Sequence, residues 1–312
     1  MPSSVDPQGP AADDIAALWW IMLAAGTVVF AVVVVLLVAP MLRRRRRPEP
    51  PDGDRGEVPA RLASRWIVGL GVVLPAVLLV GVLVISVSTM RSISRAAPRG
   101  STIIEVVGYQ FWWAATYPDE GVTVANELHI PAGEPVELRI TSADVIHSFW
   151  VPELHGKLDG LPETTNTLTI EADEPGVYGG VCAEFCGIQH ANMGFLVIAD
   201  EPSDYDAWLA GQQRQPAEPA TEAARRGEAL FAAESCARCH RIGDTTASED
   251  GPDLTHVASR RTLAADTIEN TTEQLTRWLR DPDAVKPGTT MPTPELSDEQ
   301  IADLVAYVEG LE

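Results

Sequence analysis

The sequence predicts a membrane-anchored, multidomain chain: a hairpin of two transmembrane helices, a β-sandwich and a small all-α domain. Three observations predict this fold class. Two uncharged apolar runs lie within residues 1–90, residues 101–199 alternate like short strands, and residues 221–312 carry helix-capping signals. At 312 residues, 46% of them hydrophobic, the chain is long enough for an anchor and two globular domains.

Two apolar runs predict the membrane anchor. They extend from Ile15 to Leu42 and from Trp66 to Met90, 28 and 25 residues without a charge. Each exceeds the roughly 20 residues that cross a bilayer as a helix. The loop 43–65 between them holds eight arginines and the tail 1–14 holds no basic residue. Positive charge stays in the cytoplasm, so this loop is expected inside and both chain ends outside. A cleaved signal peptide is the alternative for the first run, which is too long for one and follows an acidic tail.

Residues 101–210 are expected to form an outer domain of short strands. Apolar and polar residues alternate from Val136 to Thr141 and from Thr167 to Glu171. Pro131-Ala-Gly133 and Glu174-Pro-Gly176 are turn signals between such segments. This pattern predicts a β-sandwich.

A linker rich in Gln, Pro and Ala, residues 211–220, precedes the helical domain 221–312. Its composition is typical of a semi-extended tether, which would keep the two globular domains close together. Three helices are expected beyond the linker. They are Thr221 to Ala233, a helix opened by a capping box at Thr271 and Gln274 and ended at Asp281-Pro282, and a last helix capped at Ser297 and Gln300 with Ile301, Leu304, Val305 and Val308 on its apolar face.

One loop of the outer domain carries four soft metal donors. The string Cys182-Ala-Glu-Phe-Cys186-Gly-Ile-Gln-His190-Ala-Asn-Met193 supplies two thiols, an imidazole and a thioether. Sulfur and imidazole favour copper over cations that need oxygen ligands. One cysteine suffices for a single blue-copper ion, so the second thiol favours two metals with bridging sulfurs. His147, in Asp144-Val-Ile-His147, is available as a second imidazole. A disulfide or a zinc site is the alternative for the Cys-x3-Cys pair alone.

A second cofactor motif lies in the helical domain. Cys236-Ala-Arg-Cys239-His240 is the signature of covalent c-type haem attachment, with His240 as proximal iron ligand. Pro287-Gly-Thr-Thr-Met291-Pro292 places a thioether on a later loop. This order resembles a class I cytochrome c, in which Met291 would be the sixth iron ligand. Ligation by His and Met would leave no open iron position, so the haem should carry electrons rather than bind oxygen. His256 is the competing distal ligand, and a solvated loop histidine is its ordinary interpretation. A zinc knuckle or a redox dithiol is the alternative for the pentapeptide.

These motifs resemble subunit II of haem-copper cytochrome c oxidases, and the resemblance covers essentially the whole chain. It implies a cupredoxin-like sandwich with the dinuclear copper centre CuA, and a fused class I cytochrome c domain, as in caa-type oxidases. It implies the following copper ligands: His147, Cys182, Cys186, His190, Met193 and the backbone carbonyl of Glu184. The Glu184 side chain would also help to hold a magnesium ion at the boundary with subunit I. The implied haem c residues are Cys236, Cys239, His240 and Met291, with the Pro252 carbonyl orienting the imidazole.

The chain departs from the family at two places. The family usually has Gln-Trp-x-Trp where this chain has Gln110-Phe111-Trp112-Trp113, so phenylalanine stands where electrons enter from soluble cytochrome c. Electrons would enter through the tethered haem by another contact, or Trp112 would substitute. The alternative is that these aromatics only pack at the subunit interface. The segment 157–166 also lacks the Gly-Arg pair that often follows the proline, which affects contacts with subunit I.

The net charge of -21 is unevenly spread. Residues 101–210 hold 18 acidic and two basic residues, which gives -16, and residues 221–312 hold 18 and nine, which gives -9. Nucleic acid is excluded as a partner, because phosphate binding needs clustered Lys and Arg. The acidic faces would either attract a basic cytochrome or simply keep the domains soluble.

The resemblance implies the subunit at which electrons enter an aerobic terminal oxidase of a bacterial plasma membrane. Electrons from cytochrome c or a cytochrome bc complex would pass through haem c and CuA to haem a of subunit I, where oxygen is reduced at CuB and protons are pumped. Subunit III would be a further partner, and this chain would hold no catalytic residue of its own. The alternatives are the copper subunit of a nitric oxide reductase and a membrane-anchored copper chaperone, which would need a thioredoxin-like βαβ fold. A membrane cytochrome with a decayed copper domain is a further alternative, and the intact ligand set excludes a copper-free quinol oxidase.

Overall fold

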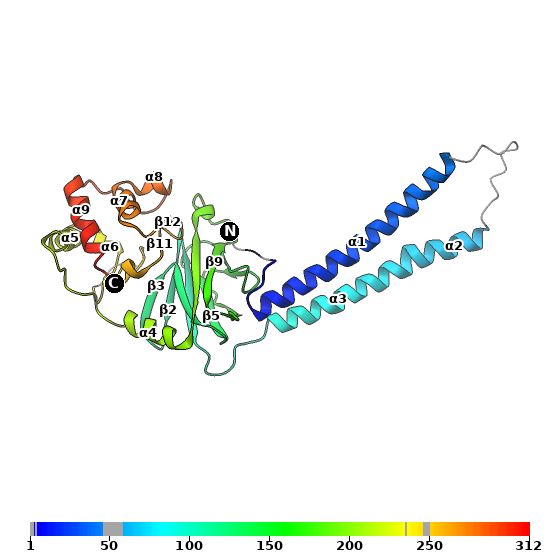
Figure 1. The fold of residues 1–312 in the computed structure, drawn as a ribbon, viewed down its shortest axis with the longest axis horizontal. Helices are drawn as coiled ribbons and strands as arrows, with labels where there is room; N and C mark the ends of the chain where they lie inside the picture. The colour runs from blue at the N-terminus through cyan, green and yellow to red at the C-terminus, as the bar shows by residue number, and fades with distance from the viewer. Residues whose placement is uncertain (1–2, 4, 46–58, 235, 246–249) are drawn as a thin grey trace. The chain divides into compact units, whose positions relative to one another are not determined.

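The computed structural model describes residues 3, 5–45, 59–234, 236–245 and 250–312. The chain separates into two compact units (Figure 1). One unit is Asp14–Ile93, and the other combines Met1–Asp13 with Ser94–Glu312.

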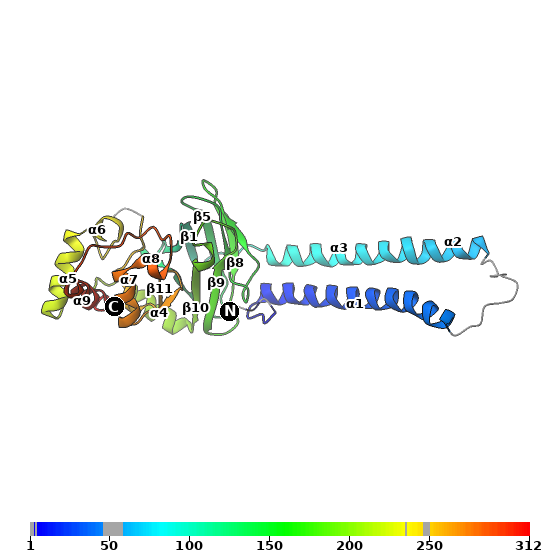
Figure 2. The ribbon, with the colours of Figure 1, turned by 90° about the horizontal axis from the view of Figure 1, so that it is seen from above.

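Two long helical runs make up the first unit (Figure 2). The first is α1, Pro10–Arg45, and the second joins α2, Ala60–Val68, to α3, Leu74–Ile93, through a π-helical turn at Gly69–Val73. Pro75 has no N–H to donate to the preceding turn, which accounts for the widened backbone before it.

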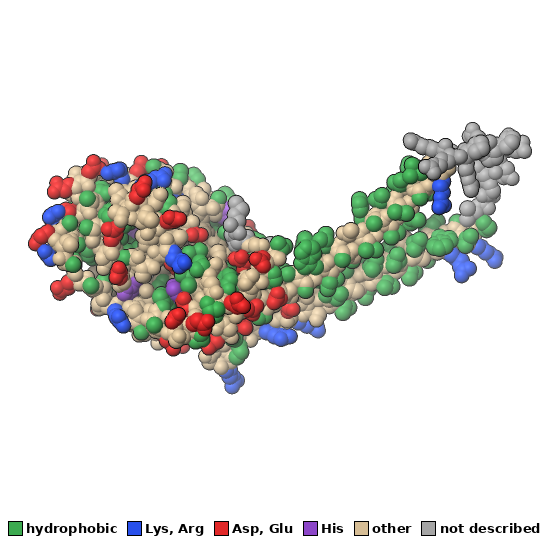
Figure 3. Space-filling model, in the orientation of Figure 1, with side chains coloured by type: hydrophobic (Ala, Val, Ile, Leu, Met, Phe, Trp, Pro, Cys, Tyr) green, Lys and Arg blue, Asp and Glu red, His purple; other side chains and the backbone are tan. Residues whose placement is uncertain are grey.

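Both runs expose apolar side chains along most of their length. Side chains such as Phe30 and Leu79 are 70% exposed, and apolar residues cover the face seen in Figure 3. Both runs are long and apolar enough to cross a membrane. A helix without a polar face is unfavourable in water and suited to lipid. The prediction of two apolar helices is confirmed. Most of the basic loop, residues 46–58, lies outside the described residues.

Two five-stranded sheets form the sandwich of the second unit. The strand orders are β3-β2-β1-β5-β8 and β4-β10-β9-β6-β7, with β1–β5 and β10–β4 as parallel pairs. The strand bounds of the first sheet are β1 Ile103–Tyr109, β2 Trp112–Tyr117, β3 Val122–Ala125, β5 Val136–Ser142 and β8 Asn166–Ile170. Those of the second are β4 Glu127–Pro131, β6 His147–Trp150, β7 Leu158–Gly160, β9 Gly176–Cys182 and β10 Gly194–Asp200.

The alternation in the sequence explains how the sheets pack. Residues of β5 are buried at every second position, as expected for a strand with one face on a core. Trp113, Phe149 and Phe195 are fully buried between the sheets, with ring centroids 4.3 to 5.7 Å apart. The predicted β-sandwich is confirmed.

A helix that the sequence analysis missed follows the sandwich. This helix, α4, runs from Pro202 to Gln212 and therefore includes the start of the expected linker 211–220. Pro202 at its first turn, with Asp204 behind it, was a usable start signal. Beyond it come α5 Glu222–Ala233, α6 Cys236–Cys239, the hairpin β11 Thr262–Leu263 and β12 Ile268–Glu269, α7 Thr272–Arg280, α8 Pro282–Val285 and α9 Asp298–Val308.

Helices α5 and α9 pack closely at the core of the helical domain (Figures 1 and 2). A Cβ atom on Gly227 of α5 would lie 2.1 Å from the carbonyl oxygen of Asp303 on α9, so only glycine allows this approach. Arg226 beside it donates to both carboxylate oxygens of Asp303 at 2.6 and 2.7 Å. The predicted apolar face of α9 is buried against this core.

Of the two predicted capping boxes, that of α9 is confirmed and that of α7 is half wrong, and α5 has a cap that was not predicted. Thr221 caps α5, and Ser297 with Gln300 forms a complete capping box at α9. At α7 the Thr271 hydroxyl accepts from Gln274 N, but the Oε1 atom of Gln274 is buried without a hydrogen-bond partner among the described residues. The reciprocal bond of the predicted box is therefore not formed.

Candidate copper and haem sites

Three strands position the copper donors. His147 begins β6, Cys182 ends β9, and the chain then forms the copper loop, residues 182–193, before β10. Cys182 N donates to the carbonyl oxygen of Met193 at 3.0 Å, and Ala183 N donates to that of Ser148 at 2.8 Å. These bonds close the loop against β6, so donors that are distant in sequence share one place.

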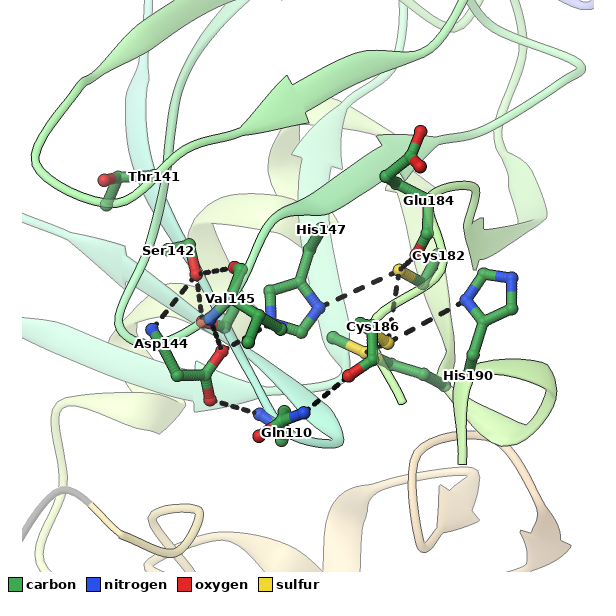
Figure 4. A network of polar contacts seen from close by, with 12 residues as sticks. Gln110, Thr141, Ser142, Asp144, Val145, His147, Cys182, Glu184, Cys186 and His190 are labelled. Carbon is green, nitrogen blue, oxygen red and sulfur yellow. Dashed lines mark hydrogen bonds and ion pairs between the residues drawn. The ribbon is translucent and has the colours of Figure 1, made fainter. Parts of the chain in front are cut away.

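The predicted copper donors lie next to one another, and Figure 4 shows the contacts that join His147, Cys182, Cys186 and His190 in turn. Sγ of Cys182 lies 3.8 Å from Nδ1 of His147 and 3.9 Å from Sγ of Cys186. Sγ of Cys186 lies 3.8 Å from Nδ1 of His190 and 3.7 Å from Sδ of Met193. Two donors bonded at about 2.3 Å to one ion are roughly 3.8 Å apart at a tetrahedral angle. The separations therefore suit ligands that share metal ions.

The chemistry of this donor set fits two soft ions better than the alternatives. Both cysteines are free, and their sulfurs are too far apart for the roughly 2.05 Å bond of a disulfide. A structural zinc ion takes four ligands, whereas two thiols, two imidazoles, a thioether and a carbonyl converge here. The residues present thus fit a dinuclear copper centre.

The two thiols share protons unequally. The hydrogen bond to Cys186 lowers the pKa of Cys182, and the same bond, with burial, raises the pKa of Cys186. One thiolate forms readily and the second is resisted by the first, because both lie in a buried site. Deprotonation of both thiols would therefore need the positive charge of a bound metal.

Asp144 orients the first imidazole. Its Oδ1 atom lies 2.7 Å from Nε2 of His147, so that Nδ1 faces Cys182 (Figure 4). Burial lowers the pKa of His147, but the hydrogen bonds to Cys182 and Asp144 outweigh it and raise that pKa. Gln110 N holds the other Asp144 oxygen at 2.7 Å. Such a carboxylate–histidine pair fixes the tautomer of a metal ligand.

Glu184 divides its two oxygen groups between different partners. Its backbone carbonyl lies 3.3 Å from Sγ of Cys182, where a weak copper ligand is expected. Its carboxylate points away from the sulfurs in Figure 4 and lies 3.6 Å from Nζ of Lys157. No pattern in the sequence points to Lys157 as a partner of this carboxylate.

The three aromatics before the site lie in different environments. Phe111 is buried and Trp113 is fully buried, with its ring centroid 5.7 Å from that of His147. Trp112 is partly buried and stacks on Tyr109 at 4.5 Å. Trp113 therefore packs in the core behind His147, and Trp112 is the more accessible indole.

Three of the predicted haem residues lie together in sequence at α6 and directly after it. Cys236 and Cys239 are free and partly buried on α6, and Nδ1 of His240 lies 2.8 Å from the carbonyl oxygen of Pro252. This bond leaves Nε2 as the nitrogen for iron, and burial lowers the pKa of His240 and so favours the neutral imidazole that binds metal. A Cβ on Gly251 would lie 2.8 Å from the ring, so glycine is needed there. These residues fit covalently attached haem c.

Met291, the other predicted iron ligand, lies on the loop between α8 and α9 and is partly buried. No described contact joins its sulfur to His240, so its role stays a prediction.

His256 is wrongly expected to be a solvated loop residue. It is buried, with Nδ1 2.8 Å from the carbonyl oxygen of Glu312 and Nε2 3.1 Å from that of Gln212. Both ring nitrogens are thus engaged, which argues against His256 as an iron ligand. Arg260, to which no sequence motif points, donates to the carbonyl oxygen of Asp253, and its charge contributes to lowering the pKa of His240.

Fold and sites together define a class of protein: a membrane-anchored electron carrier in which a cupredoxin domain and a cytochrome c domain share one chain. Two family models match it. They are cytochrome c oxidase subunit II, periplasmic domain, over residues 120–200, and cytochrome c, over residues 224–312. The chain belongs to the cytochrome c oxidase subunit 2 family, with a fused C-terminal cytochrome c domain.

Individual relatives are named cytochrome c oxidase subunit 2. Cytochrome c oxidase subunit 2 of Bacillus sp. (strain PS3) is 30% identical over 83% of this chain and 78% of its own length. That of Alkalihalophilus pseudofirmus is 44% identical over 67% of this chain, a match that spans 60% of the relative's length. The crystal structure of the periplasmic domain of cytochrome oxidase subunit II from Bradyrhizobium japonicum is 26% identical, covering 38% of this chain and 97% of that one, at a TM-score of 0.37. At that score the structural match adds nothing to the assignment.

Proposed function

We propose that this chain carries electrons into an aerobic caa-type oxidase, with haem c and dinuclear CuA as its carriers and haem a of subunit I as acceptor. Oxygen reduction and proton pumping would take place in subunit I. The convergence of two cysteines, two histidines and a methionine around adjacent sulfurs, on a chain that also carries Cys-x-x-Cys-His, supports the proposal. When bound, both cofactors supply one-electron redox chemistry without an open site for substrate.

The protein's contribution would be a rigid ligand frame. Electron transfer is fast when metal geometry barely changes between oxidation states. The copper loop is closed by backbone bonds at both ends, and the Cys186 carbonyl accepts a hydrogen bond from Gln110 Nε2. Asp144 fixes His147, and the Pro252 carbonyl fixes His240. The ligands are therefore held in place by the fold as well as by metal.

The orientation across the membrane is part of the proposal. The eight arginines of residues 43–65 favour a cytoplasmic loop, and the tail and both globular domains would then face outward. Contacts of the tail support this arrangement. Gln8 N donates to the Glu153 carbonyl at 2.8 Å, and Asp173 N donates to the Gln8 carbonyl at 2.9 Å. The tail thus pairs with the copper domain, as two membrane crossings allow.

The proposed partners are subunits I and III of the oxidase, membrane lipid, and cytochrome c or a cytochrome bc complex as donor. The Glu184 carboxylate, directed away from the copper donors, is proposed to help hold magnesium at the boundary with subunit I. The two five-stranded sheets argue against a copper chaperone, because such a chaperone would need a thioredoxin-like fold. A nitric oxide reductase would use the same electron carriers, and co-purifying chains distinguish it.

The test is metal and spectral analysis of the purified full chain and of its His190→Asn variant. The wild type should hold two coppers and one haem, with a mixed-valence copper spectrum. The variant should lose that spectrum and keep a reducible haem c. Unchanged copper absorption would refute the ligand assignment. Co-purification with a subunit that contains haem a and CuB, and oxygen uptake by the complex, would establish the reaction.

A further inference from the structure

The cytochrome domain contacts the copper domain through buried polar groups at two places. One is the hairpin segment, residues 261–269, which contains β11 and β12. The other is the methionine loop, residues 286–291, which ends at the predicted iron ligand Met291. Both sit against residues of the sandwich or its copper loop.

Glu127 makes the first contact. It is only 5% exposed, at the start of β4, and all described hydrogen bonds to its carboxylate come from the hairpin segment. Arg261 N and Thr262 N each donate to Oε1 at 2.8 Å, and the Thr262 hydroxyl does so at 3.2 Å. A buried carboxylate is costly unless it is hydrogen-bonded. Glu127 is therefore satisfied only while the two domains are together.

Lys286 makes the second contact in the opposite direction. It belongs to the cytochrome domain, is 3% exposed, and donates from Nζ to the carbonyl oxygen of Phe111 in the copper domain at 3.0 Å. Nζ also donates to the carbonyl oxygen of Ala264 at 3.2 Å. Each domain thus contributes one buried charged side chain, which forms hydrogen bonds with backbone groups of the other domain.

The copper loop and the methionine loop are also in contact. Gln189 of the copper loop donates from Nε2 to the carbonyl oxygen of Pro287. The Thr290 hydroxyl, next to Met291, lies 3.5 Å from the carbonyl oxygen of Gln110, and Gln110 donates to the carbonyl oxygen of Cys186. The loops that bear the predicted ligands of the two cofactors are therefore neighbours.

The backbone of the hairpin segment is shaped for this contact. Ala264, Ala265 and Asp266 have φ values of 53°, 58° and 56°, a left-handed conformation that residues other than glycine rarely adopt. In this conformation the Ala264 carbonyl meets Lys286, and the Ala265 carbonyl accepts from Gly194 N of β10 at 3.1 Å. Backbone strain of this kind persists where surrounding contacts hold it.

We propose that Glu127 and Lys286 are positioning residues that hold the cytochrome domain in one docked arrangement on the copper loop. The linker then does not act as a free tether. This inference rests on the proposed electron relay and names its internal donor surface. The proposal also gives Phe111 a role. This residue is buried, and its carbonyl oxygen accepts a hydrogen bond from Lys286 of the cytochrome domain.

Hydrogen exchange of single amides in the purified full-length chain tests the docking directly. The amide of Gly194 reports the bond to Ala265, and those of Arg261 and Thr262 report the bonds to Glu127. All three should be protected in the wild type. Lys286→Met and Glu127→Gln each leave buried polar groups unpaired, and each should lower this protection roughly tenfold.

The matched controls make the same kinds of substitution at residues outside the contact between the domains. Arg225→Met replaces a cation of α5 that pairs with Glu222, and Glu137→Gln replaces an acid of β5 that pairs with Arg139. Neither should change the three amides. Haem and copper spectra identical to wild type exclude misfolding of a docking variant, and Glu127→Gln tests the contact from the other domain if Lys286→Met fails to fold.

Electron transfer from flash-reduced haem c to copper supplies a readout that simple destabilisation would not move. A docked domain needs no diffusion, so the wild-type rate should not depend on solvent viscosity. In the Glu127→Gln/Lys286→Met double variant the rate should fall as viscosity rises. Wild-type amides that exchange as fast as those of a free linker, or a viscosity-dependent wild-type rate, would overturn the docking. Protected amides on a chain that passes no electrons to copper would support the docking and refute the relay.

Discussion

Nε2 of His147 lies 2.7 Å from the carboxylate of Asp144, three residues earlier in the chain. The acid accepts the Nε2 proton, and Nδ1 is left to face Cys182 at 3.8 Å. Gln110 in turn fixes Asp144 through its backbone N–H, and its side chain reaches the Cys186 carbonyl. The turn at Gln110, between β1 and β2, therefore supports ligands on both sides of the copper site.

Asp144→Asn should weaken copper binding by roughly 10- to 100-fold, as expected for loss of a carboxylate behind a metal-bound histidine. The asparagine keeps the shape but removes the charge that orients and strengthens the imidazole. Competition with a copper chelator measures the effect. Asp119→Asn, on the exposed turn after β2, is the control. Equal copper retention in both variants would remove Asp144 from the site.

Met291→Ala should convert a low-spin haem c to a high-spin or ligand-exchanged form, because iron would lose its sixth ligand. His256 cannot readily replace it, since its ring nitrogens contact the carbonyls of Gln212 and Glu312. Absorption near the Fe–S charge-transfer band and the spin state measure the change. Met193→Ala should alter the copper spectrum and leave the haem unchanged. An intact low-spin spectrum in Met291→Ala would assign the ligand elsewhere.

The sequence offers candidate cofactor residues because their signals are mostly local. The copper donors from Cys182 to Met193 lie in one loop, and the haem motif is a pentapeptide. The contacts that join the domains have no such signal. Glu127 binds residues 134 and 135 positions away, and Lys286 follows a short helix where a lysine reads as solvated. Only the packed structure reveals that both charges are buried.

Gly227→Ala should destabilise the cytochrome domain by about 1–3 kcal/mol, because the new methyl group would overlap the Asp303 backbone on α9. Helix propensity alone predicts the opposite sign, since alanine is favoured over glycine by about 1 kcal/mol inside a helix. Gly211→Ala in α4 is the matched control, with no atom within 4 Å of the added Cβ. Thermal unfolding followed at the haem should show a lower midpoint for Gly227→Ala only. Equal midpoints would mean that α5 and α9 are not in contact at Gly227.

The buried ammonium of Lys286 predicts a pH dependence of stability. Burial lowers its pKa to about 8, from an ordinary value of 10.5, while the charge of Cys186 opposes the shift. The folded chain therefore binds fewer protons than the unfolded chain between these two values, and its stability rises with pH there. The cost of burying the charge is fully present below pH 8 and disappears as pH rises toward 10.5, a change of at most about 3 kcal/mol.

Thermal midpoints of wild type and Lys286→Met at pH 7.5 and 9.5 measure this change in stability. The wild type should gain stability relative to the variant at the higher pH. A difference that stays constant, or shifts toward the variant, would mean that Lys286 is solvated and that its contact with the Phe111 carbonyl does not form in solution.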